Sequence, residues 1–282
     1  MKRFLIAGIV TFVTLSFHNA YADRAPKGYE LLQSNPKYSF RYSRPGEPVR
    51  RGKTSERMEV RDGFCRGTDC SEDRLRSEIR IPHRQAKARV GKDIWFGWSF
   101  RVAQFSSDLR KVGVYPFLGQ WKTAPENSPT VYFIMGGGKG AGDVYVSLGD
   151  MARRHNNMVA GAKWGHVCRK IFSIEQAKRQ WVDIVLNTNF SSGADGYLKV
   201  WINGKLACSY SGQIVATRSS NDYRGPNHRR GIYIGNTSRW RAKRGSEPIP
   251  TVVVYYDEFL SGKTRGEVDT RMREAAGLPP KD

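Results

Sequence analysis

Alternation of apolar and polar residues with a period of two runs through most of this chain, and it constrains the fold more than any other feature. Between residues 93 and 102, every second residue is a large apolar one. A period of two places successive side chains on opposite faces of a strand, so that one face is buried and the other is solvated. We predict further strands on this pattern at residues 38–42, 57–61, 74–81, 114–121, 130–135, 144–148, 181–190, 196–203, 231–234 and 251–259.

Turn signals separate these segments and leave little room for helices. Asn203-Gly204 lies between two alternating runs and predicts a two-residue hairpin. Short helices are predicted at residues 173–180, capped by Ser173, and at residues 264–276. Residues 211–230 are polar and basic without sustained alternation, and we interpret them as a long loop. Many strands and few short helices predict an all-β fold, a concanavalin-like β-jelly roll sandwich of two antiparallel sheets.

The first residues have the three parts of a secretory signal. Two basic residues precede an apolar stretch at residues 4–17, and Ala20-Tyr21-Ala22 supplies small residues where a signal peptidase reads the chain. The pattern predicts a signal peptide at residues 1–22, a single domain at residues 23–282, and a secreted or periplasmic protein. An uncleaved anchor is the alternative, although the apolar stretch is short for a membrane span.

The chain is strongly basic, with a formal net charge of +21. A charge of this size attracts polyanions. Nucleic acid is a common partner of basic proteins, but export directs the prediction towards acidic polysaccharides. We therefore expect a uronate-containing polysaccharide as the partner, neither nucleic acid nor a membrane, and a monomer. A generally basic, soluble surface is the alternative, and it explains the charge alone.

The chain contains four cysteines, an even number that predicts two disulfides in an exported protein. Three pairings are open. We favour the local pair Cys65–Cys70, which closes a short loop and leaves Cys168–Cys208 to join two distant segments. A zinc site is the rival interpretation, but the spacing is wrong for zinc and no histidine lies near the first pair.

Three charged residues share one face of the strand predicted at residues 74–81. Arg76, Glu78 and Arg80 alternate there with apolar or small residues. Three charges in a row are costly inside a core, so this face is solvated or lines a polar groove. An arginine fork can hold a carboxylate in two parallel hydrogen bonds. Glu78 then braces the arginines or contacts sugar hydroxyls. A solvated face with cross-strand ion pairs is the equal alternative.

Two more predicted strands carry polar side chains on one face. Gln120 and Lys122 share a face, and Trp121 between them points the other way. A neutral amide beside a cation is a suitable receptor for a uronate carboxylate. Tyr233 lies on the open side of its strand between two glycines, which allow a ligand to approach the backbone closely. A single tyrosine on a sheet more often serves packing.

The order of these segments resembles that of the heparin lyase I-like polysaccharide lyases. The framework is also similar to that of the glucuronan lyases and, more distantly, of the jelly-roll alginate lyases. The resemblance covers most of the chain after the signal peptide, and the blocks that carry it are Arg76-Ser77-Glu78-Ile79-Arg80, Gln120-Trp121-Lys122, residues 195–205, Gly231-Ile232-Tyr233 and residues 254–258.

The resemblance implies a jelly roll with a concave substrate face and β-elimination next to a uronic acid. A base removes the C5 proton, donors stabilise the charge that builds on the carboxylate, and an acid assists the leaving sugar. Carried over to this sequence, Gln120 and Arg76 are the neutralising residues and Tyr233 is the proton-transfer residue. Arg80 and Glu78 shape the groove.

One position departs from the family pattern, which usually reads Gln-x-His. Lys122 stands at the histidine position and is a catalytic candidate as a base of lowered pKa, or as a group that only grips the carboxylate. The departure also leaves open a protein that binds without cleaving. Further candidate substrate-binding residues are Tyr132, His166, which could substitute as the base, and Trp240, which could stack on a sugar ring.

No cofactor and no metal are predicted. Asp257 and Glu258 could bind calcium, but no cluster of oxygen ligands at fixed spacing supports this. A glycoside hydrolase would need two paired carboxylates, and the sequence contains no such motif. A polysaccharide lyase is therefore the favoured function, and a non-catalytic module that binds acidic polysaccharide is the alternative. An adhesion protein is supported by charge alone.

Overall fold

The computed structural model describes residues 24–33, 38–123, 129–136, 143–149, 165–215 and 226–281. The predicted signal peptide lies outside these residues. Within the described ranges, no helix is long and apolar enough to cross a membrane.

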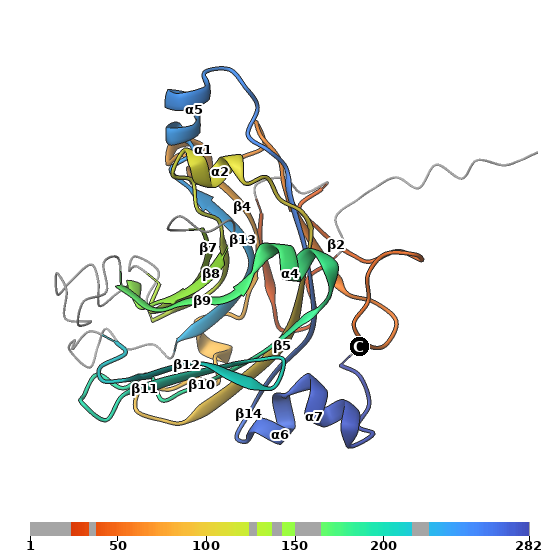
Figure 1. Ribbon diagram of the computed structural model, residues 1–282, viewed down its shortest axis with the longest axis vertical. Helices are drawn as coiled ribbons and strands as arrows, with labels where there is room; N and C mark the ends of the chain where they lie inside the picture. Colours follow the sequence, from red (N-terminus) through yellow and green to blue (C-terminus); the bar gives the residue numbers. More distant parts are fainter. Residues whose placement is uncertain are drawn as a thin grey trace, which may run out of the picture.

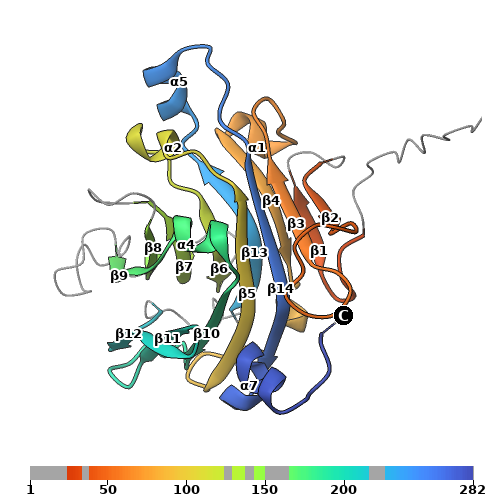
Figure 2. The ribbon, with the colours of Figure 1, turned by 45° about the vertical axis from the view of Figure 1, so that its right-hand side comes forward.

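Two seven-stranded antiparallel sheets pack face to face (Figures 1 and 2), which confirms the predicted all-β sandwich. In spatial order, sheet A contains β1 (Glu30–Gln33), β4 (Arg74–Arg80), β13 (Asn227–Gly235), β6 (Phe117–Lys122), β7 (Val131–Met135), β8 (Asp143–Ser147) and β9 (His166–Ser173). Sheet B contains β12 (Lys205–Ser211), β11 (Tyr197–Ile202), β10 (Val182–Thr188), β5 (Ile94–Gln104), β14 (Val252–Gly262), β3 (Glu56–Val60) and β2 (Phe40–Tyr42).

The core lies between the sheets and consists of the apolar half of each alternating strand. Trp98 of β5 contacts Trp121 of β6 and Phe133 of β7, with ring centroids 5.8 Å and 5.2 Å away. These three rings are almost completely buried, so they add strongly to the hydrophobic stabilisation of the sandwich. Tyr256 of β14 also joins the sheets, because its hydroxyl donates a hydrogen bond to the carbonyl of Leu118 on β6.

Short helices lie at the ends of the sandwich, three of them (α1, α2 and α5) at one end and α6 and α7 at the other (Figure 1). Ser173 caps α4 as predicted, since its Oγ accepts the N–H of Gln176 at 3.0 Å. The single helix predicted at residues 264–276 is two helices, because Asp269 between them has an extended backbone. The bounds are α1 Thr68–Ser71, η1 His83–Gln85, α2 Asp108–Lys111, α4 Ile174–Arg179, α5 Ser238–Arg244, α6 Arg265–Val268 and α7 Thr270–Ala275.

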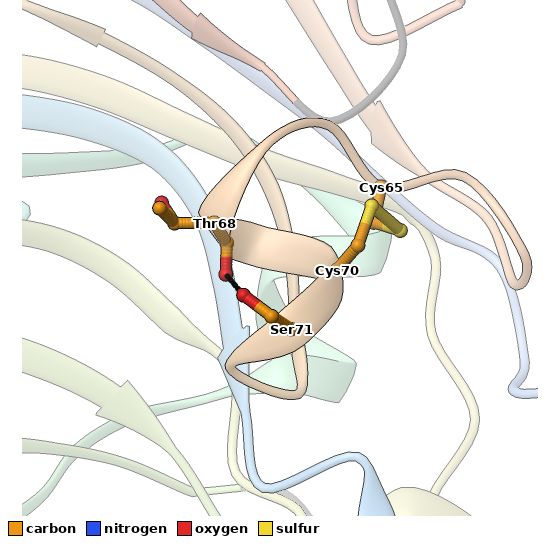
Figure 3. Close-up of a disulfide and its surroundings, with 4 residues drawn as sticks. All are labelled: Cys65, Thr68, Cys70 and Ser71. Atoms are coloured by element: carbon orange, nitrogen blue, oxygen red, sulfur yellow. Dashed lines mark hydrogen bonds between the residues drawn. A yellow bond between two sulfur atoms is a disulfide. The ribbon is translucent and has the colours of Figure 1, made fainter.

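Both predicted disulfides are confirmed. Cys168–Cys208 joins β9 at the edge of sheet A to β12 at the edge of sheet B. Cys65–Cys70 closes the short loop that leads into α1 (Figure 3). Cys168–Cys208 therefore links the two sheets, whereas Cys65–Cys70 fixes a local loop beside β4.

Two interpretations of the sequence are corrected. The long loop expected at residues 211–230 is shorter, because β13 already begins at Asn227. Residues 227–230 show no apolar alternation, because the core-facing positions of this strand hold His228 and Arg230. The glycine expected to admit a ligand at Gly231 is required instead by the next strand, since an added Cβ would lie 2.1 Å from the carbonyl oxygen of Ser77.

Candidate functional site

The outer face of sheet A carries a row of polar side chains that crosses six strands. Residues paired across antiparallel strands project to the same face, so the strand register alone defines this row. From β4 to β9 its members are Arg80, Arg229, Gln120, Tyr132, Ser147 and His166.

A second row lies parallel to the first and begins with a cation beside a phenol. Arg76 of β4 is the direct partner of Tyr233 on β13, and its guanidinium carbon lies 5.2 Å from the centre of the phenol ring. Tyr233 is followed across the sheet by Phe117, Ile134 and Tyr145. The three residues on which the proposed chemistry depends most, Arg76, Gln120 and Tyr233, therefore share one face of three neighbouring strands.

Glu78 connects the two rows. Its Oε1 accepts a hydrogen bond of 2.6 Å from Nε2 of Gln120, and its Oε2 lies 4.0 Å from Nη1 of Arg76. The carboxylate is 2% exposed, so both interactions are shielded from water. Gly231, the partner of Glu78 on β13, contributes no side chain to this face. The amide and the guanidinium thus converge on one buried carboxylate.

Burial shifts the two groups that are candidates for proton transfer in opposite senses. Burial, and then the charge of Arg229, lower the pKa of Lys122 to about 8, while Glu78 opposes the shift. Burial raises the pKa of Tyr233 above that of an ordinary phenol. Near neutral pH the lysine is therefore able to lose its proton, and the tyrosine keeps its own.

Two residues of this face were missed by the sequence analysis. Arg229 is 5% exposed, and burial lowers its pKa. Within the described residues no hydrogen bond or ion pair reaches its guanidinium, and its Nε is buried without an acceptor. Asn227, the strand partner of Lys122, is completely buried, and neither amide atom has a partner among the described residues. No apolar alternation marks either residue, so only the strand register reveals them.

The first-row residues of the β7–β9 side are uncharged polar or aromatic groups. Nδ1 of His166 lies 2.6 Å from Oγ of Ser147, and burial lowers the pKa of His166 to about 4. The imidazole is therefore uncharged at neutral pH. The phenol of Tyr132 also hydrogen-bonds Ser147, and burial raises its pKa. Phe117 stacks on Tyr132 with ring centroids 4.5 Å apart, which gives this side an aromatic character.

The two remaining candidates lie at the margin of the face or away from it. Arg80 is at the edge next to β1, where its Nε donates to Glu30 at 2.8 Å and its side chain is 34% exposed. Trp240 belongs to α5, has no exposed surface, and donates from Nε1 to the carbonyl of Glu247. Its ring packs in the core, so the structure does not bring it together with the other candidates, and no sugar can stack on it in this conformation.

Asp257 and Glu258, the residues considered for calcium, bind arginines and backbone amides. Oδ2 of Asp257 accepts the N–H of Arg50 at 2.7 Å, and Oε2 of Glu258 lies 3.2 Å from Nη1 of Arg51. In the part of the chain that the structure describes, no three His, Cys, Asp or Glu side chains are grouped so as to hold a metal ion.

Fold and face together define a β-jelly roll with a buried, cationic, amide-bearing sheet surface. The chain belongs to the polysaccharide lyase family, whose model matches residues 27–260. It is similar to the solved endo-β-1,4-glucuronan lyase of the fungus Trichoderma reesei, with 18% identity, a TM-score of 0.59, and coverage of 88% of this chain and 97% of that one. This similarity shows that the two proteins share a fold.

A second solved structure gives a weaker match. The marine PL-14 alginate lyase of Aplysia kurodai is 14% identical, with a TM-score of 0.48 and coverage of 80% of this chain and 87% of that one. No curated protein sequence matches the chain. Family membership thus identifies a lyase of polysaccharides and leaves the roles of the individual residues to be derived from the site.

Proposed function

We propose that this protein is an exported lyase that cleaves a uronate-containing polysaccharide by β-elimination on the outer face of sheet A. The observation that carries the proposal is the shared face of Arg76, Gln120 and Tyr233 on three neighbouring strands. The solved neighbours named above are lyases of glucuronan and alginate, and the uronate class is carried over from them.

Elimination needs charge to be stabilised on the sugar carboxylate while the C5 proton leaves. Arg76 and Gln120 are the neutralising donors in this proposal, and Arg229 joins them as a buried cation whose Nε has no acceptor among the described residues. Preorganised donors in a site shielded from water stabilise such charge more strongly than water does. Glu78 braces the first two donors, and Arg80 contacts the polymer at the edge of the face.

The base and the acid follow from the opposed pKa shifts. Lys122, with its pKa lowered to about 8, takes the C5 proton. The electron pair forms the C4–C5 double bond, the bond from C4 to the leaving oxygen breaks, and Tyr233, whose pKa is raised, donates a proton to that oxygen. Groups whose environments separate their pKa values in this way suit acid and base roles. Tyr132 and His166 bind the neighbouring sugar on the β7–β9 side.

The test is the ultraviolet absorbance of the unsaturated uronate, which elimination produces and hydrolysis does not. We expect absorbance to rise with at least one polymer of a panel of glucuronan, alginate and heparin-like chains. The heparin-like polymers belong in the panel because the heparin lyase I-like resemblance is itself still a prediction. Tyr233→Phe is expected to abolish turnover and to leave the fold intact. Binding without any rise in absorbance would favour the non-catalytic module.

A further inference from the structure

A buried carboxylate outside the proposed chemistry contacts the site. Asp69 of α1 is 8% exposed, and its Oδ1 accepts a hydrogen bond of 2.8 Å from Nη2 of Arg76. Arg76 is also the group that lies against the Tyr233 ring and faces Glu78 at 4.0 Å. Asp69 therefore holds Nη2 of the guanidinium while Glu78 faces Nη1, and it limits how that guanidinium can rotate.

The helix that carries Asp69 is too short to hold its own position. It has four residues, its N-cap Gly67 makes no side-chain capping bond, and an isolated helix of this length is unstable in water. The disulfide Cys65–Cys70 encloses Asp69 in its loop, and Ser71 Oγ donates to the Thr68 carbonyl at 3.2 Å (Figure 3). The covalent link is thus a constraint that keeps Asp69 beside Arg76.

We propose that Asp69, held by the Cys65–Cys70 disulfide, is a positioning residue that orients Arg76 against Tyr233. Its effect on turnover rests on the proposed function, whereas its effect on Arg76 and Tyr233 does not. A fixed guanidinium meets the sugar carboxylate in one geometry, and misplacement of such a group slows the chemical step more than it weakens binding.

The charges around the Tyr233 phenol give the proposal a second readout. Burial raises the pKa of this phenol, the neighbouring arginines lower it, and the two carboxylates raise it. Removal of the Asp69 charge therefore lowers the pKa of Tyr233. The charged groups that face the phenol are Arg74, Arg76 and Glu78 on β4, Asp69 on α1, and Arg229 on the same strand as Tyr233.

The experiment compares Asp69→Asn with Ser71→Ala, a control on the same helix that leaves the carboxylate in place. We expect Asp69→Asn to lower kcat roughly 10- to 100-fold with a smaller change in KM, and Asp69→Glu to restore part of the loss. Tyrosinate absorbance, measured as the difference between matched proteins with and without Tyr233→Phe, is expected to show a lower phenol pKa. Ser71→Ala should change neither.

The double variant Cys65→Ser with Cys70→Ser is expected to reproduce the loss in kcat, and Asp69→Asn should add little to it. A folded Asp69→Asn protein with wild-type kcat and an unmoved phenol titration overturns the proposal. Wild-type kinetics in the double serine variant overturn the role of the disulfide. If wild type forms no unsaturated product but the phenol titration moves in the double serine variant, which keeps the Asp69 charge, the positioning role stands and the proposed function fails. If Asp69→Asn does not fold, the phenol titrations of Asp69→Glu and of the double serine variant decide whether Asp69 positions Arg76.

Discussion

Arg229 and Arg230 are neighbours on β13, both are buried, and they face opposite sides of sheet A. Arg230, on the core side, donates from Nε to Glu56 at 2.5 Å and from Nη2 to the other oxygen of the same carboxylate. Its guanidinium also lies between the rings of Tyr29 and Phe259, and only Nη1 lacks an acceptor. The guanidinium of Arg229, on the outer side, has no hydrogen bond or ion pair within the described ranges, although Glu78 attracts its charge.

The difference separates a charge that belongs to the fold from one that belongs to a site. A buried cation is costly unless a partner compensates it. Burial opposes the charge of both residues, but Glu56 outweighs it and raises the pKa of Arg230, whereas the pKa of Arg229 is lowered. Arg230 therefore has its anion in a bidentate pair with Glu56, whereas the charge of Glu78 does not outweigh burial at Arg229, which suits Arg229 to receive an anion from outside the protein.

The largest expected effect is a loss of stability when the ion pair between Arg230 and Glu56 is broken. Glu56→Gln leaves a buried cation without its anion, and we expect a loss of about 3 to 5 kcal/mol in the free energy of unfolding. Urea denaturation measures it. Glu30→Gln is the matched control, because it removes the exposed partner of Arg80, and a surface pair contributes about 0 to 1 kcal/mol. Equal losses in the two variants would contradict the comparison.

The next effect is on binding, from the other side of the same strand. Arg229→Gln removes a buried cation whose pKa is lowered by burial in spite of the charge of Glu78, so the free energy of unfolding should not fall. We expect binding of the acidic polymer to weaken by about 1.5 to 3 kcal/mol, the range for a hydrogen bond to a charged group. Titration calorimetry measures the binding of the polymer, with Glu56→Gln as the comparison variant. If Arg229→Gln lowers stability and leaves binding intact, Arg229 is a structural residue.

The same strand explains how much the sequence could predict. Alternation predicted the sandwich because burial of one strand face dominates the pattern, and the even cysteine count gave both disulfides. It failed at Asn227 and Arg229, since the core-facing positions between and after them hold His228 and Arg230, so this part of the strand has no apolar periodicity and resembles a loop. Asp69 was missed because a short helix outside the sheets brings it to Arg76. Trp240 was misassigned, because composition cannot tell a core indole from an exposed one.

His228, the neighbour of Arg229 on the core side, extends the comparison to pH. Its ring stacks on Phe259 at 4.1 Å, and burial, together with Arg230, places its pKa well below 6.5. Below pH about 6.5 the unfolded chain binds a proton at His228, and the folded chain does not. The free energy of unfolding therefore decreases as pH falls, by at most about 1.4 kcal/mol per pH unit. His228→Phe should flatten this slope between pH 6.5 and 5.

Thermal or urea unfolding across this range measures the slope. The raised pKa of Asp257, about 6, acts in the opposite direction, because the folded chain takes up that proton more readily. Asp257 is present in both proteins, so the difference between wild type and His228→Phe isolates the histidine. Identical slopes would mean that the folded chain protonates His228 as readily as the unfolded chain does, and that core burial of His228 carries no pH dependence.

The smallest effect concerns Lys122, whose pKa is lowered first by burial and then by Arg229. If Lys122 is the base, kcat/KM rises roughly fivefold from pH 7 to pH 8 as the amine loses its proton. If it only grips the carboxylate, activity falls above pH 8 instead. In Arg229→Gln one source of the shift is absent, so the rise should move to higher pH. Lys122→His should move it to lower pH, towards the ordinary histidine pKa of about 6.5. A rise that stays in place in both variants would show that another group titrates, and that the outer face of β13 does not tune the base.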